Sequence, residues 1–450
     1  MSKKPLKGLS DRLKDELIRQ SLERRSRKDK RESAVPGGRR RDVVRVASTS
    51  DIPDEWGSLD QLPAYQQLRI LQAGAARMGI KSPFFQQHDG VSGRTTRIDG
   101  RECISFSNYN YLGLCGHPEV DAAAKQAIDE QGTSVSAARP VSGERALHRE
   151  LEADLAGVHG VEACLTFVSG HATNVTSIGY LFGPADLVVH DSLIHNSALV
   201  GIQLSGAARR VFPHNDLDAL DRLLAKERTQ FQRVLIVVEG IYSMDGDYPD
   251  LPRLIDIKSR HKAFLMVDEA HSFGVMGTTG KGIREHFAVD GADVDIWMGT
   301  LSKAMAGCGG YIAGSEALVE HLKIAAPGFL YSVGMSPPVA AAAKKALEVM
   351  LREPERVERL QHNGRRFLEL AERAGVNCGT STGLAVVPAI TGSSARAVRL
   401  TSDLLEQGVS AQPIIYPAVE EKAARVRFFI NAQLTDDDLE FAADKLRDCL

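Results

Sequence analysis

Apolar residues along this chain fall into short runs, and longer segments with apolar residues at helical spacing separate one run from the next. Runs of this length predict buried strands, and the segments between them predict amphipathic helices. Strands are predicted at residues 103–106, 164–168, 187–190, 234–239, 264–267 and 295–299, and helices at 65–78, at 147–158 and from near Ala172. Strands that alternate with helices are typical of a parallel sheet, so we predict an α/β fold with a large, mostly parallel sheet.

The pattern changes after about residue 340. A long helix is predicted at 340–351, followed by mixed short elements that end in a strand at 425–431 and a helix at 436–449. The chain has 450 residues, which exceeds the usual size of one hydrophobic core. We therefore predict an N-terminal extension at 1–60, an arm at 61–115, a large domain at 116–340 and a smaller α+β domain at 341–450.

Polar side chains directly follow two of the predicted strands. Asp268 and His271 come after one run, and Thr300, Ser302 and Lys303 come after the next. Ligands of open α/β sheets bind outside the carboxyl ends of the strands. We therefore expect these five side chains to face one crevice.

A carboxylate, an imidazole, two hydroxyls and a lysine suit an aldehyde cofactor that carries a phosphate, such as pyridoxal phosphate (PLP). The Lys303 amine can form a Schiff base with the aldehyde, and Asp268 can keep the pyridine nitrogen protonated, which makes the ring an electron sink. His271 can bond the ring hydroxyl and Thr300 the phosphate, for which the helix start after Ser169 is a second candidate. Taken singly, Lys303 also fits a surface lysine and Asp268 a helix cap.

Residues 268–271 also spell the DEAH box of nucleic-acid helicases. That box works with an upstream phosphate loop of the form GxxxxGK[ST], and the chain contains no such segment. The nearest candidate, Gly280-Lys281-Gly282, has Val275 in place of the first glycine and Gly282 in place of the hydroxyl residue. The sequence therefore does not favour a helicase or a nucleic-acid partner.

The composition is that of a globular protein, with 43% hydrophobic and 25% charged residues. No apolar run approaches the length of a membrane span, and the basic N-terminus lacks the apolar core of a signal peptide. We therefore expect a cytoplasmic protein without a transmembrane segment. The six cysteines form no CxxC pair, which argues against a zinc site or a disulfide framework, and no metal is predicted.

The net charge of −3 is unevenly distributed. Residues 1–42 contain 15 Lys or Arg and 7 Asp or Glu, so this segment carries +8 and the remaining 408 residues carry −11. Apolar residues recur at helical spacing between Leu9 and Leu22, after a candidate N-cap at Ser10, which predicts a short amphipathic helix. The segment fits a solubilising tail or a helix that docks a partner, and it fits nucleic-acid binding less well because the body of the chain is acidic.

A set of motifs resembles the α-oxoamine synthases, a family of PLP enzymes that includes serine palmitoyltransferase, 5-aminolevulinate synthase, 8-amino-7-oxononanoate synthase and 2-amino-3-ketobutyrate CoA ligase. The motifs are SNYNYLGL (107–114), GTS (132–134), HRELEADLAGVHG (148–160), SGHATN (169–174), EGIYSMDGD (239–247), VDEAHSFGVMGTTGKG (267–282), GTLSKAMAGCGGYIAG (299–314) and RVR (425–427). The resemblance covers roughly residues 60–450, in the order of the family. It implies fold type I of PLP-dependent transferases, active as a homodimer with the cofactor at the subunit interface.

By position, the resemblance also assigns roles to single residues. It implies Lys303 as the Schiff-base lysine, Asp268 as partner of the pyridine nitrogen, His271 beside the ring hydroxyl, His195 stacked on the ring and Ser243 beside it. It places Gly170, His171, Thr300 and Ser302 at phosphate positions. Arg427 falls where the family binds the amino-acid carboxylate, which a guanidinium can grip with two hydrogen bonds, and Asn110 is a second substrate-binding candidate.

The reaction that the resemblance implies is a decarboxylative Claisen condensation of a small α-amino acid with an acyl thioester of coenzyme A or an acyl-carrier protein, giving an α-amino ketone. NYNYLG is similar to the serine palmitoyltransferase version of its motif, which favours serine or alanine over glycine. The chain departs from the family at Leu434-Thr435, where histidine-threonine is common, and at 420–422, where a glycine before RVR is missing.

Two alternatives stay open. Another fold-type I enzyme, such as an aminotransferase or an aldolase, would share the cofactor residues. An inactive subunit that supports a partner is the other, although Lys303 argues against it. Acyl-carrier proteins are generally acidic, so the basic N-terminal segment is a candidate docking site for one.

Overall fold

The structure is a computed structural model of the chain, and it describes residues 49, 52–77 and 82–450. The chain forms two compact units, which divide between Gly74 and Ala75. The first contains η2 (Asp54–Gly57), η3 (Leu59–Gln61) and most of α2 (Pro63–Arg77), so the helix predicted at 65–78 is present. Trp56 of this unit is 58% exposed. The amphipathic helix predicted near the N-terminus lies outside the described residues.

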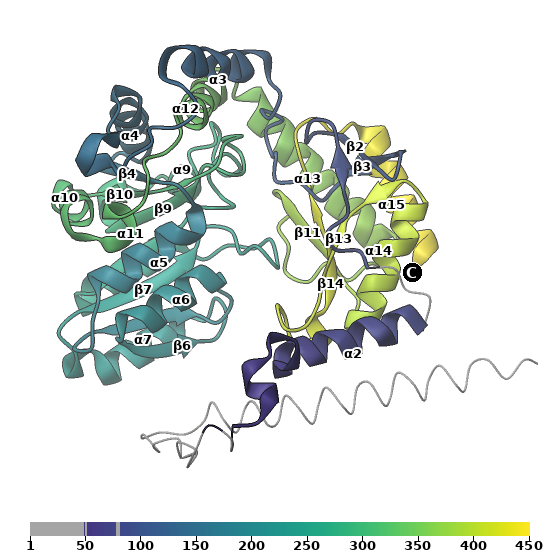
Figure 1. The fold of residues 1–450 in the computed structure, drawn as a ribbon, viewed down its shortest axis with the longest axis horizontal. Coiled ribbons are helices and arrows are strands. Elements are labelled where there is room, and N and C mark those ends of the chain that lie inside the picture. The colour runs from purple at the N-terminus through teal and green to yellow at the C-terminus, as the bar shows by residue number, and fades with distance from the viewer. Residues whose placement is uncertain (1–48, 50–51, 78–81) are drawn as a thin grey trace, which may run out of the picture. The chain divides into compact units, whose positions relative to one another are not determined.

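The second unit is built around a seven-stranded sheet in the order β4-β10-β9-β8-β7-β5-β6 (Figure 1). Its strands are β4 (Ala163–Phe167), β5 (Leu187–Asp191), β6 (Ala208–Phe212), β7 (Val234–Glu239), β8 (Phe264–Asp268), β9 (Ile296–Thr300) and β10 (Gly310–Gly314). Only β10 runs against the others, because it pairs antiparallel with both β4 and β9. The predicted α/β class with a mostly parallel sheet is confirmed.

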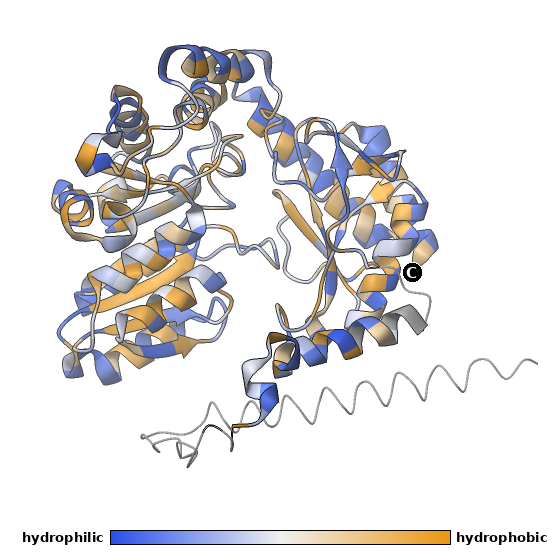
Figure 2. Cartoon of the chain, viewed as in Figure 1, coloured by the Kyte–Doolittle hydropathy of each residue, from blue (hydrophilic) through white to orange (hydrophobic). Residues whose placement is uncertain are grey.

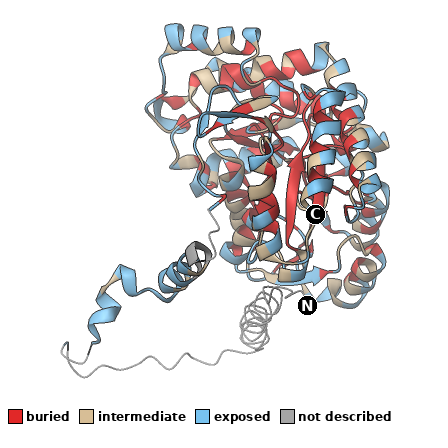
Figure 3. Cartoon of the chain, turned by 90° about the vertical axis from the view of Figure 1, so that its right-hand side faces the viewer, coloured by how far each residue is buried: buried red, intermediate tan, exposed pale blue. Residues whose placement is uncertain are grey.

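The helices of this half of the unit connect the strands. They are α3 (Pro118–Gln131), α4 (Ala146–His159), α5 (Gly170–Leu181), α6 (Asn196–Ser205), α7 (Leu217–Glu227), α8 (Leu251–His261), α9 (Ile283–Phe287), α10 (Glu316–Ala325) and α11 (Pro327–Leu330), with short turns η4 (Arg139–Gly143), η5 (Arg228–Gln230) and η6 (Gly291–Asp293). Every residue of β5, β7 and β9 is buried. Figure 2 shows orange, hydrophobic strand segments between bluer helices, and Figure 3 shows buried segments in red. Such continuous apolar strands are typical of a sheet covered on both faces.

Sequence periodicity did not predict β6 and β10. Three of the five residues of β6 are exposed, so its apolar signal is weak. β10 begins and ends with glycine and lies directly after the Lys303 loop, and nothing in its five residues marks an antiparallel direction. Gly299 of β9 explains one close contact, because a Cβ there would come within 2.2 Å of the Tyr311 ring on β10.

Two smaller sheets complete the unit. The three strands β11 (Val386–Ile390), β14 (Arg425–Phe429) and β13 (Gln412–Ile414) pair antiparallel, with η7 (Glu421–Ala423) before β14. The other sheet contains β1 (His88–Asp89), β2 (Thr95–Ile98), β3 (Arg101–Ser105) and β12 (Val409–Ser410). The remaining helices are α12 (Pro337–Arg352), α13 (Glu355–Arg373), α14 (Ser394–Glu406) and α15 (Asp436–Cys449). These elements confirm a smaller α+β part, whereas the exact domain boundaries stay a prediction.

The core of the large sheet contains a buried histidine surrounded by aromatic rings. His159 stacks between Phe273 and Trp297, with ring centroids 5.5 and 5.4 Å away. Its Nε2 lies 2.8 Å from the hydroxyl of Tyr311. Burial, assisted by the Arg284 charge, lowers the pKa of His159 to about 3, so the ring is neutral and belongs to the hydrophobic core. No helix among the described residues is long and apolar enough to cross a membrane.

Candidate active site

A cavity of about 310 Å³ lies where β7, β8 and β9 end and where α5 and α6 begin. Its volume is at the lower end of the roughly 300–1,000 Å³ range of small-molecule sites. Ten of the eleven predicted site residues line it: Gly170, His171, His195, Ser243, Asp268, His271, Thr300, Ser302, Lys303 and Arg427. The fold therefore brings together residues that lie up to 257 positions apart in the chain.

Asp268 ends β8 at the carboxyl edge of the sheet. Its Oδ2 accepts a hydrogen bond from Nδ2 of Asn174 at 2.8 Å, and its Oδ1 accepts one from the backbone N–H of Ala270 at 3.0 Å. The Asn174 amide donates a second bond to Ser197 at 2.9 Å. The two donors fix the orientation of this buried carboxylate. Asn174 and Ser197 are supporting residues that the strand-end pattern did not identify.

Lys303 lies in the loop after β9, and its Nζ is 5.8 Å from the centre of the Tyr109 ring. The residue is half-buried and lines the cavity. Burial lowers the pKa of this amine to about 8, assisted by the Arg427 charge and opposed by the Asp268 and Glu239 carboxylates. An amine with such a pKa is partly unprotonated near neutral pH, as a nucleophile requires.

The start of α5 forms a tight cradle with the end of β9. A Cβ at Gly170 would come within 2.8 Å of Oγ1 of Thr300, so only glycine allows this approach. Ser169 caps the helix, and the free backbone N–H groups of such a helix start bind anions such as phosphate. The hydroxyls of Thr300 and Ser302 donate to the Gly309 carbonyl at 2.9 and 3.4 Å. They would have to turn from that carbonyl to donate to a phosphate.

His195 is the N-cap of α6. Its Nδ1 lies 2.7 Å from Oγ of Ser197 and accepts a longer bond from the Ser197 backbone at 3.3 Å. Burial lowers the pKa of His195, which favours the neutral imidazole. The ring lines the cavity with its orientation fixed by the cap, and a fixed neutral ring is suited to stacking on a planar ligand.

His271 lies three residues after Asp268 and packs nearly parallel to Phe429, with ring centroids 6.0 Å apart and an interplanar angle of 10°. Its Nδ1 is 2.6 Å from the hydroxyl of the buried Tyr111. Burial lowers the pKa of His271 well below its ordinary value. The cavity therefore receives a neutral imidazole held from two sides.

The arginines of the RVR motif have different partners. Arg425 is occupied, because its Nη1 bonds Asp245 at 2.6 Å and the Met244 carbonyl at 2.7 Å. Arg427 donates to the Ser243 carbonyl at 2.7 Å and lies 4.3 Å from the centre of the Phe429 ring. Its buried Nε makes no hydrogen bond to a described residue. Arg427 is therefore the arginine with donor capacity left for a ligand.

Asn110 is the one predicted site residue that does not line this cavity. Its Nδ2 donates to the Ser92 carbonyl at 2.8 Å, and its Oδ1 accepts from the Cys115 backbone at 3.0 Å. Both ends of the amide therefore hold neighbouring loops in this chain.

Glu239 is a cavity residue that was not among the predicted site residues. It ends β7 in register with Asp268 of β8, so two carboxyl groups occupy paired positions on neighbouring strands. Its Oε2 accepts from the Ser243 backbone at 3.2 Å, and its buried Oε1 has no partner among the described residues. Burial, followed by the nearby Asp268 charge, raises the pKa of Glu239 to about 8. The charged residue that ends an otherwise apolar strand was the available signal.

A larger cavity of about 590 Å³ lies at the opposite edge of the sheet, where β8 and β9 begin. Two of its charged residues are paired, Arg233 with Asp186 at 2.8 Å and Asp295 with Lys258 at 2.7 Å, and Glu162 accepts a hydrogen bond from the Glu316 backbone at 2.8 Å. It contains none of the predicted site residues, and the smaller cavity is the candidate active site.

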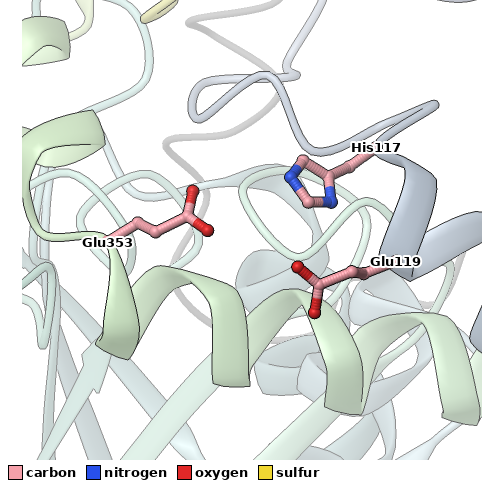
Figure 4. A group of neighbouring side chains, drawn as sticks. All are labelled: His117, Glu119 and Glu353. Atoms are coloured by element: carbon pink, nitrogen blue, oxygen red, sulfur yellow. The ribbon is translucent and has the colours of Figure 1, made fainter.

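Figure 4 shows the one group among the described residues whose ligand atoms are close enough for a metal: His117, Glu119 and Glu353. Nη2 of Arg352 lies 2.6 Å from a carboxylate oxygen of Glu119 and 2.6 Å from one of Glu353. Arg356 also pairs with Glu353 at 2.7 Å, so two arginines compensate the two carboxylates, and we assign no metal to this group.

The chain matches the family model described as aminotransferase class I and II over residues 101–446. It is 38% identical to 8-amino-7-oxononanoate synthase of Symbiobacterium thermophilum over 397 residues, which cover 88% of this chain and 96% of that protein. The solved structure of Sphingomonas wittichii serine palmitoyltransferase has a TM-score of 0.83 at 28% identity and covers 87% and 98% of the two chains. A structure of SPT with PLP as internal aldimine has a TM-score of 0.82 at 26% identity, with the same coverage.

The sheet and the lysine and aspartate at its carboxyl edge define a PLP-dependent enzyme of fold type I. The chain belongs to the aminotransferase class I and II family and, within it, to the α-oxoamine synthases. The family predicted from the motifs is confirmed. Asp268 and His271 of the DEAH sequence lie in this cavity, which excludes the helicase interpretation.

The donor set of the cavity fits PLP. The helix start at Gly170 offers an anion cradle that a Cβ would fill, and Lys303 offers an amine of lowered pKa. Asp268 offers a carboxylate for a ring nitrogen, and His195 offers a flat neutral ring. These are the groups that an aldehyde, a phosphate and a protonated pyridine require.

Proposed function

We propose that this chain condenses a small α-amino acid, serine or alanine in preference to glycine, with an acyl thioester and releases carbon dioxide, giving an α-amino ketone. One observation carries the proposal: Arg427, with its free Nε–H, enters the same cavity as Lys303 and Asp268. A buried guanidinium beside an activated lysine provides a carboxylate site next to the reacting carbon. The names of the two relatives support this reaction class. The predicted cytoplasmic location is part of the proposal.

The overall reaction forms a bond between Cα of the amino acid and the carbonyl carbon of the thioester. It breaks the carbon–sulfur bond and the bond between Cα and the carboxyl group. The products are the amino ketone, the free thiol and carbon dioxide, and one proton is taken up.

Bound PLP supplies a protonated pyridine ring that withdraws electrons from the substrate Cα. Asp268 would hold the proton on the ring nitrogen, with Asn174 and the Ala270 N–H keeping its carboxylate in place. Glu239 is the neighbouring carboxyl group, and because its pKa is raised to about 8 it stays mostly protonated at neutral pH.

Lys303 would hold the cofactor through Nζ and, once the amino acid has released it, take the proton from Cα. Arg427 would bind the amino-acid carboxylate and so orient Cα toward Lys303. His195 would cover one face of the ring. The backbone N–H groups of Gly170 and His171 would hold the phosphate.

A matrix of glycine, alanine and serine against acyl-coenzyme A and acyl-carrier-protein donors tests the proposal. The expected product is an α-amino ketone, identified by mass, with one carbon dioxide released per thiol. An aminotransferase would give a 2-oxo acid and no carbon dioxide, and an aldolase would not need the thioester. Turnover without the thioester would refute the condensation.

The homodimer belongs to the proposal, and an exposed apolar patch supports it. We define the patch as Val141, Tyr331 and Val333, which are 81%, 86% and 49% exposed. A bridge between Ala138 and Val333 joins the two segments that carry them. Large apolar side chains at this exposure suit an interface, so we propose that a second copy of the chain covers the patch.

The basic segment at residues 1–42 lies outside the described residues, and its role as a docking site for an acyl-carrier protein is also a proposal. Its charge of +8 would attract an acidic carrier through long-range electrostatics, and salt would screen this attraction. Deletion of residues 1–60 should leave turnover of a small soluble thioester nearly intact and slow the carrier-bound donor, most at low salt. Equal effects on both donors at every salt concentration would refute docking.

A further inference from the structure

Tyr111 does not line the cavity, yet it contacts a residue that does. Its hydroxyl oxygen is 2.6 Å from Nδ1 of His271, and its side chain is fully buried. Tyr111 follows β3 and His271 follows β8, so the contact joins segments 160 residues apart. At this distance the two groups share a hydrogen bond, and its direction decides which nitrogen of His271 carries a proton.

The proton of this hydrogen bond belongs to Tyr111. Burial raises the pKa of the Tyr111 hydroxyl well above its ordinary value, so it stays protonated. Burial lowers the pKa of His271, and the charges of Lys303 and Arg427 and the neighbouring His195 act in the same direction, so the imidazole stays neutral. A neutral imidazole carries one N–H. If that were Nδ1–H, the Tyr111 proton would lack an acceptor among the described residues, which is costly in a buried place.

The rest of the surroundings fix the plane of the ring. Phe429 packs nearly parallel to His271, and Tyr109 meets it edge-on, with centroids 6.2 Å apart and an angle of 86°. Packing of this kind restricts rotation of the imidazole but does not distinguish between its two nitrogens. The contact with the Tyr111 hydroxyl does distinguish between the two nitrogens, because it involves Nδ1.

We propose that Tyr111 is a positioning residue that holds His271 in one tautomer, with Nδ1 as acceptor and Nε2–H available to the cavity. His271 then presents a neutral donor to the oxygen substituent of the cofactor ring. A neutral donor stabilises an anionic oxygen without adding a further cation beside Lys303 and Arg427. The identity of the ligand rests on the proposed function, whereas the tautomer does not.

The wild-type tautomer can be measured without cofactor or substrate. Nitrogen-15 NMR of histidine-labelled, PLP-free protein, with the His271 signals identified by their loss in His271→Asn, should show a neutral ring with hydrogen on Nε2 at pH 7.5. A proton on Nδ1, or a charged ring, would overturn the proposal. Because this readout involves no substrate, failure of the proposed condensation would leave it unaffected.

The variant Tyr111→Phe keeps the ring and removes only the hydroxyl. We expect mixed His271 tautomers and PLP binding weakened about three- to tenfold, the effect of one lost hydrogen bond. The matched control is Tyr311→Phe, which removes a buried hydroxyl 2.8 Å from Nε2 of His159, away from the cavity. The control should leave the His271 signals and PLP affinity unchanged.

An unchanged tautomer in Tyr111→Phe, or an equal loss of PLP affinity in both variants, would contradict a positioning role. If Tyr111→Phe fails to fold, the wild-type tautomer still decides the question.

Discussion

Lys303 has to satisfy two opposed conditions in one cavity. It must lose its proton to act as a nucleophile, yet the Asp268 and Glu239 carboxylates stabilise its charged form. Burial and the Arg427 charge outweigh them, and the pKa is lowered to about 8. The amine is thus charged well below pH 8 and neutral well above it.

The first prediction follows from this balance. The rate of PLP attachment to the cofactor-free protein should rise as the pH increases through about 8. Borohydride treatment should fix the cofactor on the Lys303 peptide, as seen by mass spectrometry. Lys303→Ala should lack this adduct and lose turnover by several orders of magnitude. An adduct on another lysine in the wild-type protein would show that the assignment is wrong.

The second prediction concerns Arg427. Arg427→Ala should raise the dissociation constant of the amino acid about ten- to a hundredfold, since a charged hydrogen bond contributes roughly 1.5–3 kcal/mol. This dissociation constant is measured by titrating the protein with the amino acid and following the absorbance of the cofactor. Arg425→Ala is the comparison, because Arg425 is held by Asp245 and should affect stability more than affinity. The opposite ranking of the two variants would move the carboxylate site to Arg425.

At the scale of elements, one histidine connects the ends of several strands. His214, after β6, lies 3.0 Å from Asp191 at the end of β5 and 2.9 Å from Asp247 after β7. Asp247 also accepts from Thr380, in the segment before β11, at 2.8 Å. Although burial lowers the pKa of His214, the hydrogen bonds and charges of both carboxylates outweigh it and raise the pKa to about 10. The cluster therefore carries a cation at neutral pH.

The third prediction is a pH-dependent loss of stability. A raised folded-state pKa means that this contribution is fully present below about pH 6.5 and is lost as the pH rises through about 10. His214→Gln should lower the free energy of unfolding by about 1–3 kcal/mol at pH 6. The gap between wild type and variant, measured by urea unfolding, should narrow toward pH 10. A gap that stays constant across this range would assign the stability to packing instead of charge.

Sequence periodicity predicted the elements with a strong local signal. The strand at 234–239 and the helix at 436–449 appear with the same bounds as β7 and α15, because one is apolar up to its final residue, Glu239, and the other has a capping box at Thr435. The helix expected near Ala172 begins at Gly170, since Ser169 is its cap. The antiparallel direction of β10 was not predictable, because nothing in its residues marks a direction and its second neighbour, β4, is distant in the chain.

The same limit applies to the site. Lys303, Asp268 and Arg427 were identified because motifs carry them, and the cavity contains all three. The Tyr111 contact with His271 depends on how β3 is placed relative to β8, which no local pattern encodes. For Asn110, the motif predicted a substrate contact, whereas in the structure its side-chain amide forms hydrogen bonds with the Ser92 and Cys115 backbones.

At the scale of the whole molecule, the apolar patch provides the fourth prediction. Tyr331→Glu places a charge at a side chain that is 86% exposed in one chain and would be desolvated in a dimer. Light scattering should show a dimer for the wild-type protein and a shift to monomer for the variant. The control Ile324→Glu replaces a side chain that is 73% exposed outside the patch and should leave the dimer intact. An unchanged dimer in Tyr331→Glu would place the interface elsewhere.

The division between Gly74 and Ala75 also has an optical consequence. The chain contains two tryptophans, and each unit has one of them. Trp56 is 58% exposed, whereas Trp297, on β9, is fully buried and stacks on His159. The fluorescence of Trp297 should therefore appear at shorter wavelength and shift to the red only when the large sheet opens. Trp56→Phe would leave a protein whose emission reports on the catalytic unit alone.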